Sequence, residues 1–403
     1  FRQSEEVLAY GALALFVPGY LYSFGVINND NAIILDGTAI TGLCWLLAEK
    51  PDSLFAWVGL AIVYGLATLS KLTAAGFVPA IALLVLMSWN KTTNRRHLIR
   101  NIGLLAGIWL MMTGWWFWRN ISLYGELTGV HRMMLLTGEA GQNSWSHAWE
   151  SVPWIWQSFW GRLATQHFPL PRIVYDSFGV LTALSLLGWL AQWIGGRRGQ
   201  RAPGWLTLAA TFAGMIGLVA YYASDLSGGA MGRYLYPVMA SVSALMLSGL
   251  LALVPAPLRR AFCYGVWGIM TIIASLSIWW WLPSAYGLPP RINNFDPPEN
   301  FHEVNYQYGD AILLRGYTLS AQRATPGEIL AVTLYWETKA PIVEDYPLFL
   351  QIVDERNNKI AHRESYSGGG LFPTSLWTPG TVVADTVYLP VDVNTSVPQA
   401  YDL

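Results

Sequence analysis

The sequence predicts an α-helical polytopic membrane protein with about nine spans and a β-sandwich domain outside the membrane. Hydrophobic residues make up 53% of the chain and charged residues 12%, which is about half the charged share of a typical soluble domain. Three loops between apolar runs, at 91–100, 197–201 and 259–260, are basic and contain no acid. After residue 282 the apolar runs stop and strand-like alternation begins.

The membrane domain, residues 1–283, contains about nine segments that are apolar over the roughly 17–25 residues that a span requires. These segments are 8–25, 31–48, 53–70, 72–89, 102–118, 178–194, 205–222, 234–254 and 262–282. The positive-inside rule places the three basic loops in the cytoplasm. The outer side then receives the loop 26–30, the corner at Lys71, the loops 119–177 and 223–233, and the chain after Pro283.

The long outer loop, residues 119–177, contains a tryptophan-rich and nearly uncharged segment at 145–160. This composition predicts short amphipathic helices that lie in the membrane interface. Two interpretations remain open for the segment. It is either an ordinary loop at headgroup level or a lid over a lipid-linked substrate.

Residues 284–300 form a proline-rich linker, and residues 301–403 carry the pattern of short strands. Leu330, Val332, Leu334 and Trp336 occupy alternate positions, so they are expected on the core face of one strand. The segments 348–354 and 360–364 flank a turn, which predicts a hairpin, and 381–389 predicts another strand. Regular short strands indicate a β-sandwich. Because a strand is still running at Leu403, we expect this domain to be incomplete.

Three acids are candidates for contact with substrate or metal, because ionisable side chains at membrane depth are costly. Asp30 begins the second span, where it either caps the helix or contacts a ligand. Asp36 lies about 9 Å deeper at 1.5 Å per residue, and it serves either a buried hydrogen bond between helices or the substrate. Asp225 belongs to the polar loop that precedes Arg233.

Three cations lie at the outer ends of spans and are candidate phosphate ligands. Lys71 opposes the charge bias of the outer face, so it either reaches toward lipid headgroups or binds a phosphate as a point charge. Arg119 and Arg233 either anchor their helices in the interface or offer a guanidinium fork to a phosphate. Tyr234 and Tyr236 stand one and three residues after Arg233 and complete the expected phosphate cradle.

Other classes of function find no support in the sequence. No basic stripe lies outside the inner loops, so no nucleic-acid partner is expected. The sequence contains no Walker loop, G-x-S-x-G elbow or H-E-x-x-H helix. The histidine spacings match no zinc site, and Cys44 and Cys263 lie inside apolar runs where they cannot build a cluster. No cofactor is certain, although a divalent cation remains an option.

Four stretches carry a family resemblance: Gly-Val-Ile-Asn-Asn-Asp at 25–30, Gly-Leu-Ala-Thr-Leu-Ser-Lys at 65–71, Ser-Phe-Trp-Gly at 158–161 and Gly-Arg-Tyr-Leu-Tyr-Pro at 232–237. The outer run 118–126 and the β-region motifs at 315–317, 334–336 and 377–380 add to it. With these motifs the chain resembles the integral-membrane GT-C glycosyltransferases. The resemblance is to the family 39 and aminoarabinose-transferase-like proteins and to a related bacterial multi-span family.

The resemblance implies transfer of a sugar from a polyprenyl-phosphate donor to an envelope glycan, lipid or protein, on the outer side of a bacterial plasma membrane. Lys71 and Arg233 would hold the lipid phosphate, and Asp30 would match a second acidic position near substrate or metal. The family's principal carboxylate would lie upstream of Phe1, so the catalytic base is unknown here. A carboxylate base and cationic stabilisation of the leaving phosphate are what this chemistry requires.

Two alternatives to the transferase remain. One is a non-catalytic membrane protein that displays the β-domain or scaffolds envelope assembly. The other is a transporter of lipid-linked sugars, which is disfavoured because internal repeats and midplane charges are not seen. In the β-domain, Trp336, Tyr346 and Trp377 either stack on glycan or serve the structure, and the structural role is favoured.

Overall fold

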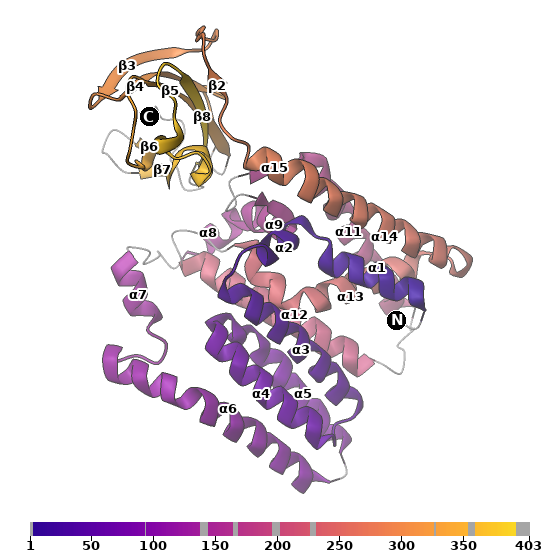
Figure 1. Ribbon diagram of the computed structural model, residues 1–403. Coiled ribbons are helices and arrows are strands. Elements are labelled where there is room, and N and C mark those ends of the chain that lie inside the picture. Colours follow the sequence, from indigo (N-terminus) through magenta and orange to yellow (C-terminus); the bar gives the residue numbers. More distant parts are fainter. Residues whose placement is uncertain are drawn as a thin grey trace. The chain divides into compact units, whose positions relative to one another are not determined.

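The computed structural model describes residues 3–92, 94–137, 144–163, 168–195, 202–225, 231–325, 328–353 and 359–391. The chain forms two compact units. The first comprises Phe1–Gly161 and Leu170–Ser275, and the second comprises Arg162–Pro169 and Leu276–Leu403. Helices build the first unit and strands dominate the second (Figure 1).

The long helices of the first unit follow the apolar segments of the sequence. The helices are α1 (Ser4–Leu15), α2 (Pro18–Phe24), α3 (Asn29–Glu49), α4 (Leu54–Ser70), α5 (Val78–Lys91), α6 (Arg95–Tyr124), α7 (Val130–Thr137), α8 (Trp145–Glu150), α9 (Val152–Gly161), α11 (Arg172–Ile194), α12 (Ala202–Asp225), α13 (Met239–Leu253) and α14 (Arg259–Leu276). Three 3₁₀ turns lead into helices: η1 (Leu72–Phe77) into α5, η2 (Gly232–Val238) into α13 and η3 (Ala256–Leu258) into α14. A π-helical turn, η4 (Ser277–Trp281), and α15 (Leu282–Ala285) continue α14.

Within the described residues, seven helices are long and apolar enough to cross a membrane, or eight if the bent pair α1 and α2 counts as one span. The remaining expected segment is α4, which is apolar but has 17 residues, at the short end of the length that spans a bilayer. The nine expected segments all correspond to helices. The polytopic helical fold is therefore confirmed.

The first expected span is broken. α1 and α2 meet at 69°, so residues 8–25 do not form the straight helix that the sequence suggested. Val17 is extended, with φ −70° and ψ 127°, and Pro18 begins α2. A residue before proline is pushed out of the helical region by steric contact with the proline ring, which explains the break.

The outer loop expected at 119–177 is shorter than predicted. α6 continues to Tyr124, and α11 already begins at Arg172. The short helices expected at 145–160 are present as α8 and α9. α9 lies against α2 and η2, so this part of the loop is packed onto the bundle.

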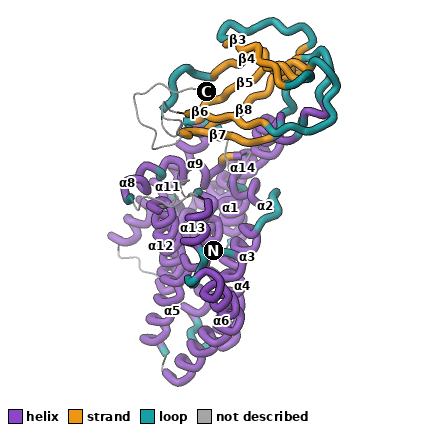
Figure 2. Tube along the Cα trace, turned by 90° about the vertical axis from the view of Figure 1, so that its left-hand side faces the viewer, coloured by secondary structure: helices purple, strands orange, loops and turns teal. Residues whose placement is uncertain are grey.

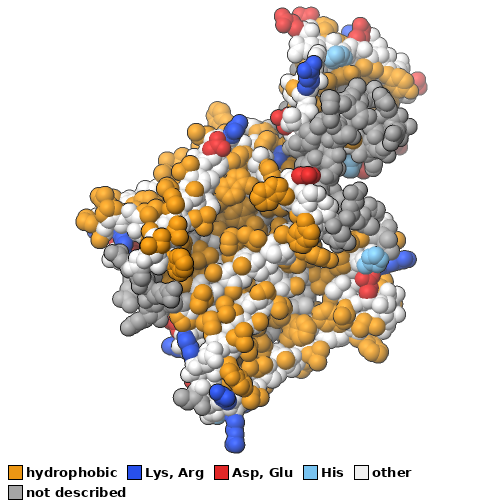
Figure 3. All heavy atoms as spheres, turned by 180° about the vertical axis from the view of Figure 1, so that it is seen from behind, with side chains coloured by type: hydrophobic (Ala, Val, Ile, Leu, Met, Phe, Trp, Pro, Cys, Tyr) orange, Lys and Arg blue, Asp and Glu red, His pale blue; other side chains and the backbone are white. Residues whose placement is uncertain are grey.

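The helices expose much apolar surface. α6 packs along α4 (Figure 1) and leaves Leu110, Met111 and Trp115 more than half exposed. Figure 3, which views the molecule from behind, shows hydrophobic side chains spread widely over the helical unit, with few charged side chains among them. A soluble monomer rarely exposes apolar surface on this scale, whereas a helix bundle in a membrane exposes apolar side chains to the lipid.

The second unit contains two antiparallel sheets (Figure 2). The larger sheet has the order β2-β8-β5-β4-β3, and the smaller is the hairpin β6-β7. The strands are β2 (Arg291–Ile292), β3 (His302–Tyr308), β4 (Ile312–Leu319), β5 (Ile329–Thr338), β6 (Leu348–Val353), β7 (Lys359–Ser365) and β8 (Val382–Pro390). Arg291 and Ile292 lie in the stretch expected as a linker, yet they pair with β8.

The two sheets share one hydrophobic core. Val332, Leu334 and Trp336 of β5 are buried as their alternation predicted, and they form one cluster with Ile352 of β6 and Ala361 of β7. The predicted hairpin is confirmed by the antiparallel pairing of β6 and β7.

The aromatic side chains considered as glycan contacts in this unit divide into two groups. Trp336 and Trp377 are 8% and 6% exposed and pack together with ring centroids 6.3 Å apart. Both are therefore core residues. Tyr346 is half exposed.

Candidate functional site

One terminus of each of three elements of the helical unit lies at the same place, and each terminus carries a charged side chain. α3 begins there because Asn28 caps it, with its Oδ1 accepting the backbone N–H of Asp30 at 2.9 Å. Asp30 therefore lies in the first helical turn and is not the cap, which corrects one of the two predicted roles. α4 ends at Ser70 because Lys71 is extended, with φ −163° and ψ 139°. Arg233 lies at the start of η2.

Asp30 holds both cations. Lys71 Nζ donates a hydrogen bond to Asp30 Oδ1, and Arg233 Nε lies 3.7 Å from Asp30 Oδ2. The Asp30 side chain is 8% exposed, against 22% for Lys71 and 38% for Arg233. The Asp30 carboxylate is thus the buried centre of the cluster, and the two cations that pair with it are more exposed.

An aromatic ring lies beside both cations. Lys71 Nζ is 4.7 Å from the centroid of the Tyr234 ring, and Arg233 Cζ is 5.9 Å from it. A ring face attracts a cation within about 6 Å. Tyr234 thereby restricts where Lys71 and Arg233 point, and Tyr222 contacts it edge-on at 6.1 Å.

One donor in the cluster has no hydrogen-bond acceptor within the described residues. Arg233 Nε is buried, and its nearest acidic oxygen, at 3.7 Å, is beyond hydrogen-bond distance. Buried donors are usually satisfied, and leaving one unmade costs about 1–3 kcal/mol. The cluster therefore has capacity for an additional acceptor oxygen.

The turn η2 is held in place by close backbone contacts. A side chain at Gly37 of α3 would meet the Pro237 carbonyl, and one at Gly232 would meet the backbone of Ile155 and Phe159 in α9. Gly232 N–H also donates to Ser158 Oγ at 2.7 Å. Two neighbouring elements thus lock the turn that carries Arg233.

Tyr236 differs from its expected place in the phosphate cradle. It is 1% exposed, and its hydroxyl donates to the backbone carbonyls of Ser158 and Phe159, at 3.2 and 3.0 Å. The hydroxyl is already used to tie α9 to η2. Tyr236 is therefore a packing residue, and Tyr234 is the tyrosine of this turn that meets the cations.

Two other candidates, Asp36 and Arg119, form no ion pair with Asp30, Lys71 or Arg233. Asp36 accepts a hydrogen bond from Ser70 Oγ at 3.4 Å, which is the interhelical bond that the sequence left as an alternative. Arg119 is exposed on α6, where no ion pair joins it to another described residue. Asp225 is the last residue of α12, and its side chain lies outside the described residues.

Among the described residues, no three His, Cys, Asp or Glu side chains come close enough together to hold a metal ion. Sequence reasoning missed the role of Asn28 as the cap of α3. The signal was present, because Asn followed by a helical run is a favoured start. It also did not anticipate that Ser158 would bond η2, since nothing local marks a contact between residues so far apart in the chain.

Residues 1–118 match the family described as dolichyl-phosphate-mannose-protein mannosyltransferase. Comparison with curated proteins and with solved structures gave no match. The matched part includes Asp30 and Lys71, and Arg233 lies beyond it. The match covers less than half of the chain and shows a similarity to this family over residues 1–118, and the described residues also contain helices long and apolar enough to cross a membrane.

Proposed function

We propose that the protein transfers a sugar from a polyprenyl-phosphate donor to an envelope acceptor, and that Lys71 and Arg233 bind the lipid phosphate. The observation that carries the proposal is the shared pairing of these two cations with the buried Asp30. The acceptor is a glycan, lipid or protein on the extracytoplasmic side of a bacterial plasma membrane.

The charge of the cluster suits a lipid phosphate. Two cations and one carboxylate leave one formal positive charge, next to the buried Arg233 Nε that lacks an acceptor. A phosphodiester donor carries one negative charge, and the leaving phosphate gains more as the bond to the sugar breaks. Cations therefore bind the transition state more tightly than the donor, which is the condition for catalysis.

The position of the cluster suits a donor with a long lipid chain. Asp30, Lys71 and Arg233 lie where α3 begins, α4 ends and η2 begins. The lipid chain of such a donor stays in the bilayer, so its phosphate must be bound where helices end. The basic loops at the opposite ends of the spans support an outer location for this end, by the positive-inside rule.

The structure suggests a positioning role for Asp30 in this proposal. Its two oxygens are directed to Lys71 and Arg233, so it orders cations that would otherwise repel each other. A phosphate oxygen would then accept hydrogen bonds from Lys71 Nζ and from Arg233 Nε, whose single N–H lacks an acceptor.

The test is a transfer assay on the full chain in liposomes with a polyprenyl-phosphate sugar. We expect K71M and R233M each to lower turnover by about 100-fold, comparable to the loss of one preorganised oxyanion donor. The control is K91M, because Lys91 lies at the end of α5 and bonds the Ala48 carbonyl. Near-normal turnover of both K71M and R233M would contradict the phosphate assignment.

A further inference from the structure

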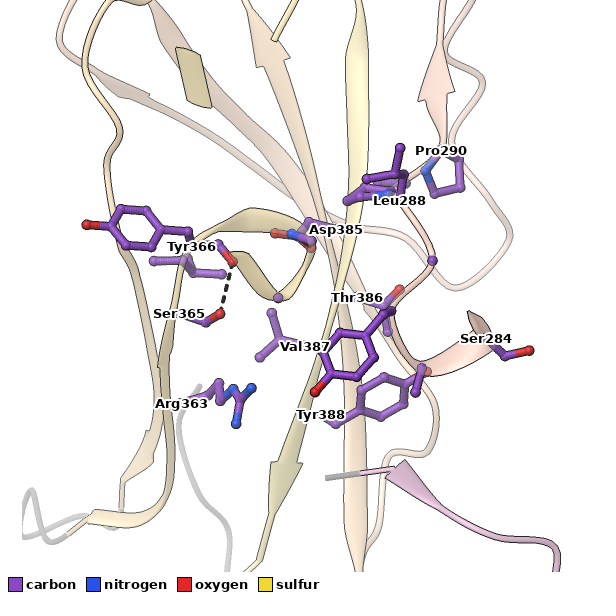
Figure 4. Close-up of a pocket in the computed structure, with 18 residues that line it drawn as sticks. Ser284, Leu288, Pro290, Arg363, Ser365, Tyr366, Asp385, Thr386, Val387 and Tyr388 are labelled. Atoms are coloured by element: carbon purple, nitrogen blue, oxygen red, sulfur yellow. Dashed lines mark hydrogen bonds between the residues drawn. The ribbon is translucent and has the colours of Figure 1, made fainter. Parts of the chain in front are cut away.

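The second unit contains a cavity of about 260 Å³. It lies between β7, β8 and the chain segment before β2, with Ser284 and Pro290 at its edge (Figure 4). Its volume lies just below the range of small-molecule sites, which is about 300–1,000 Å³. A ligand that fills it is therefore the size of one small ring with its substituents.

The two charged residues of the cavity come from facing strands. On β8, Asp385 has the same parity as the core residues Val383 and Val387, so it points between the sheets. On β7, Arg363 has the same parity as the core residue Ala361. The carboxylate and the guanidinium thus enter the cavity from its opposite walls (Figure 4).

The Asp385 carboxylate is held by the backbone. It is 3% exposed, and its Oδ1 accepts the N–H of Gly368 at 3.1 Å. A carboxylate offers about four acceptor positions, so capacity remains toward the cavity. Burial raises the pKa of this carboxyl above its usual value, which is a mark of functional sites when it coincides with a cavity.

A glycine turn forms part of the wall. Gly368 and Gly369 have φ values of 62° and 64°, a backbone region that other residues rarely adopt. A Cβ at Gly368 would lie 2.8 Å from the Pro289 ring and 3.0 Å from Phe372. The turn can therefore approach the linker only because it lacks side chains.

Tyrosine rings complete the lining. Tyr286 and Tyr388 border the cavity, whereas the ring of Tyr366, which is 45% exposed, points away from it (Figure 4). Each ring offers an apolar face together with a polar hydroxyl at its edge. Such rings suit a ligand that is apolar on one face and polar around its rim.

We propose that this cavity binds one neutral monosaccharide unit of a glycan. A sugar hydroxyl both donates and accepts, whereas a carboxylate accepts and a guanidinium only donates. Asp385 and Arg363 therefore match neighbouring hydroxyls of one sugar, and the tyrosine faces match the C–H surface of its ring.

The same residues disfavour other ligands. One charge of each sign leaves no net charge to attract an anion, and Asp385 would repel a phosphate or carboxylate that entered. A hard cation requires several oxygen ligands, but Asp385 is the one carboxylate among the described residues that line the cavity. The site differs from the aromatic residues considered from the sequence, since Trp336 and Trp377 are in the core.

The test uses the full chain in nanodiscs and the methyl glycosides of glucose, galactose, mannose, xylose and arabinose, with methyl glucuronide as a charged probe. Binding is measured by saturation-transfer NMR and titration calorimetry. We expect at least one neutral glycoside to bind with a dissociation constant near 1 mM, about −4 kcal/mol. R363Q, D385N and Y388A should each weaken it about 10-fold.

Two controls isolate the cavity. H362A and E364Q alter exposed neighbours on the other face of β7, and both should bind like the unaltered chain. K71M should also bind normally, so a failure of the proposed phosphate site would leave this result standing. The proposal is overturned if no neutral glycoside saturates, if only the glucuronide binds, or if R363Q and Y388A both bind normally.

Discussion

The backbone N–H of Gly232 donates to Ser158 Oγ at 2.7 Å, which joins the loop helix α9 to the turn that carries Arg233. The bond is buried, and Gly232 has room for no side chain because α9 lies directly against it. The Tyr236 hydroxyl supports the same contact from one turn further along η2. The position of Arg233 therefore depends on α9, although the two are distant in the sequence.

S158A should destabilise the protein and displace Arg233. The substitution leaves the Gly232 N–H buried without an acceptor, at a cost of about 1–3 kcal/mol. We expect a lower unfolding midpoint in detergent and weaker binding of polyprenyl phosphate. S122A is the matched control, because Ser122 is exposed and its hydroxyl bonds the Trp118 carbonyl of its own helix. Equal unfolding midpoints for S158A and S122A would show that the bond between Gly232 and Ser158 does not stabilise the protein.

G37A should destabilise the helical unit. A methyl group at this position meets the Pro237 carbonyl and the Phe77 ring, so the backbone of η2 must move, at a typical overpacking cost of about 1–3 kcal/mol. G42A on the same helix meets nothing within 4 Å and should be neutral or stabilising, because alanine favours helix by about 0.5–1 kcal/mol over glycine. Thermal unfolding of both variants measures the difference, and an equal response would refute the close-contact explanation.

D30N and K71M should be coupled. Asp30 is the anion shared by Lys71 and Arg233, so D30N leaves two neighbouring cations without it. In the double variant one of those cations is gone, and we expect a smaller loss of stability than the sum of the single variants, by more than about 1 kcal/mol. The exposed pair Arg172–Asp176 is the control, since such pairs contribute about 0.3–0.5 kcal/mol. Additive midpoints for D30N and K71M would contradict the pairing.

D385N should flatten the pH dependence of unfolding in the β-strand unit. Burial raises the pKa of the Asp385 carboxyl above its usual value of 3.8, so the folded state binds this proton more tightly than the unfolded state. Its contribution is therefore most favourable below the unfolded value and is lost as the pH rises through the folded pKa. Fluorescence-detected unfolding from about pH 4 upward measures the slope.

The control for that slope is D310N, which changes an exposed carboxyl of the same unit. We expect D310N to retain the fall in stability with rising pH that D385N lacks. An unchanged slope in D385N would show that Asp385 does not titrate as its burial implies.

Local features of the sequence predicted most of the architecture. The spans are visible because an apolar length suited to a bilayer is a property of each segment alone. The alternation of Val332, Leu334 and Trp336 identified the core face of β5 for the same reason. The break at Val17 was also encoded locally, since Pro18 follows it, but the apolar length of residues 8–25 predicted a single span.

Tyr236 shows where local reasoning fails. Its neighbour Tyr234 meets the cations, and nothing in the two side chains distinguishes them before the turn η2 is packed. The tight 3₁₀ geometry directs Tyr234 toward Lys71 and Tyr236 into α9. Which tyrosine faces the cations depends on the rotation of η2. The close contacts of η2 with Gly37 in α3, and of Gly232 with α9, fix that rotation.

By itself the sequence determined the helical membrane fold, the strand-rich second unit and the candidates Asp30, Lys71 and Arg233, because length, charge and periodicity are read from each segment alone. Only the tertiary structure decided that these three side chains meet, that Tyr234 accompanies them and that Arg363 faces Asp385 across a cavity. Contacts between distant segments depend on close packing of backbones, and no local pattern of residue types records that packing.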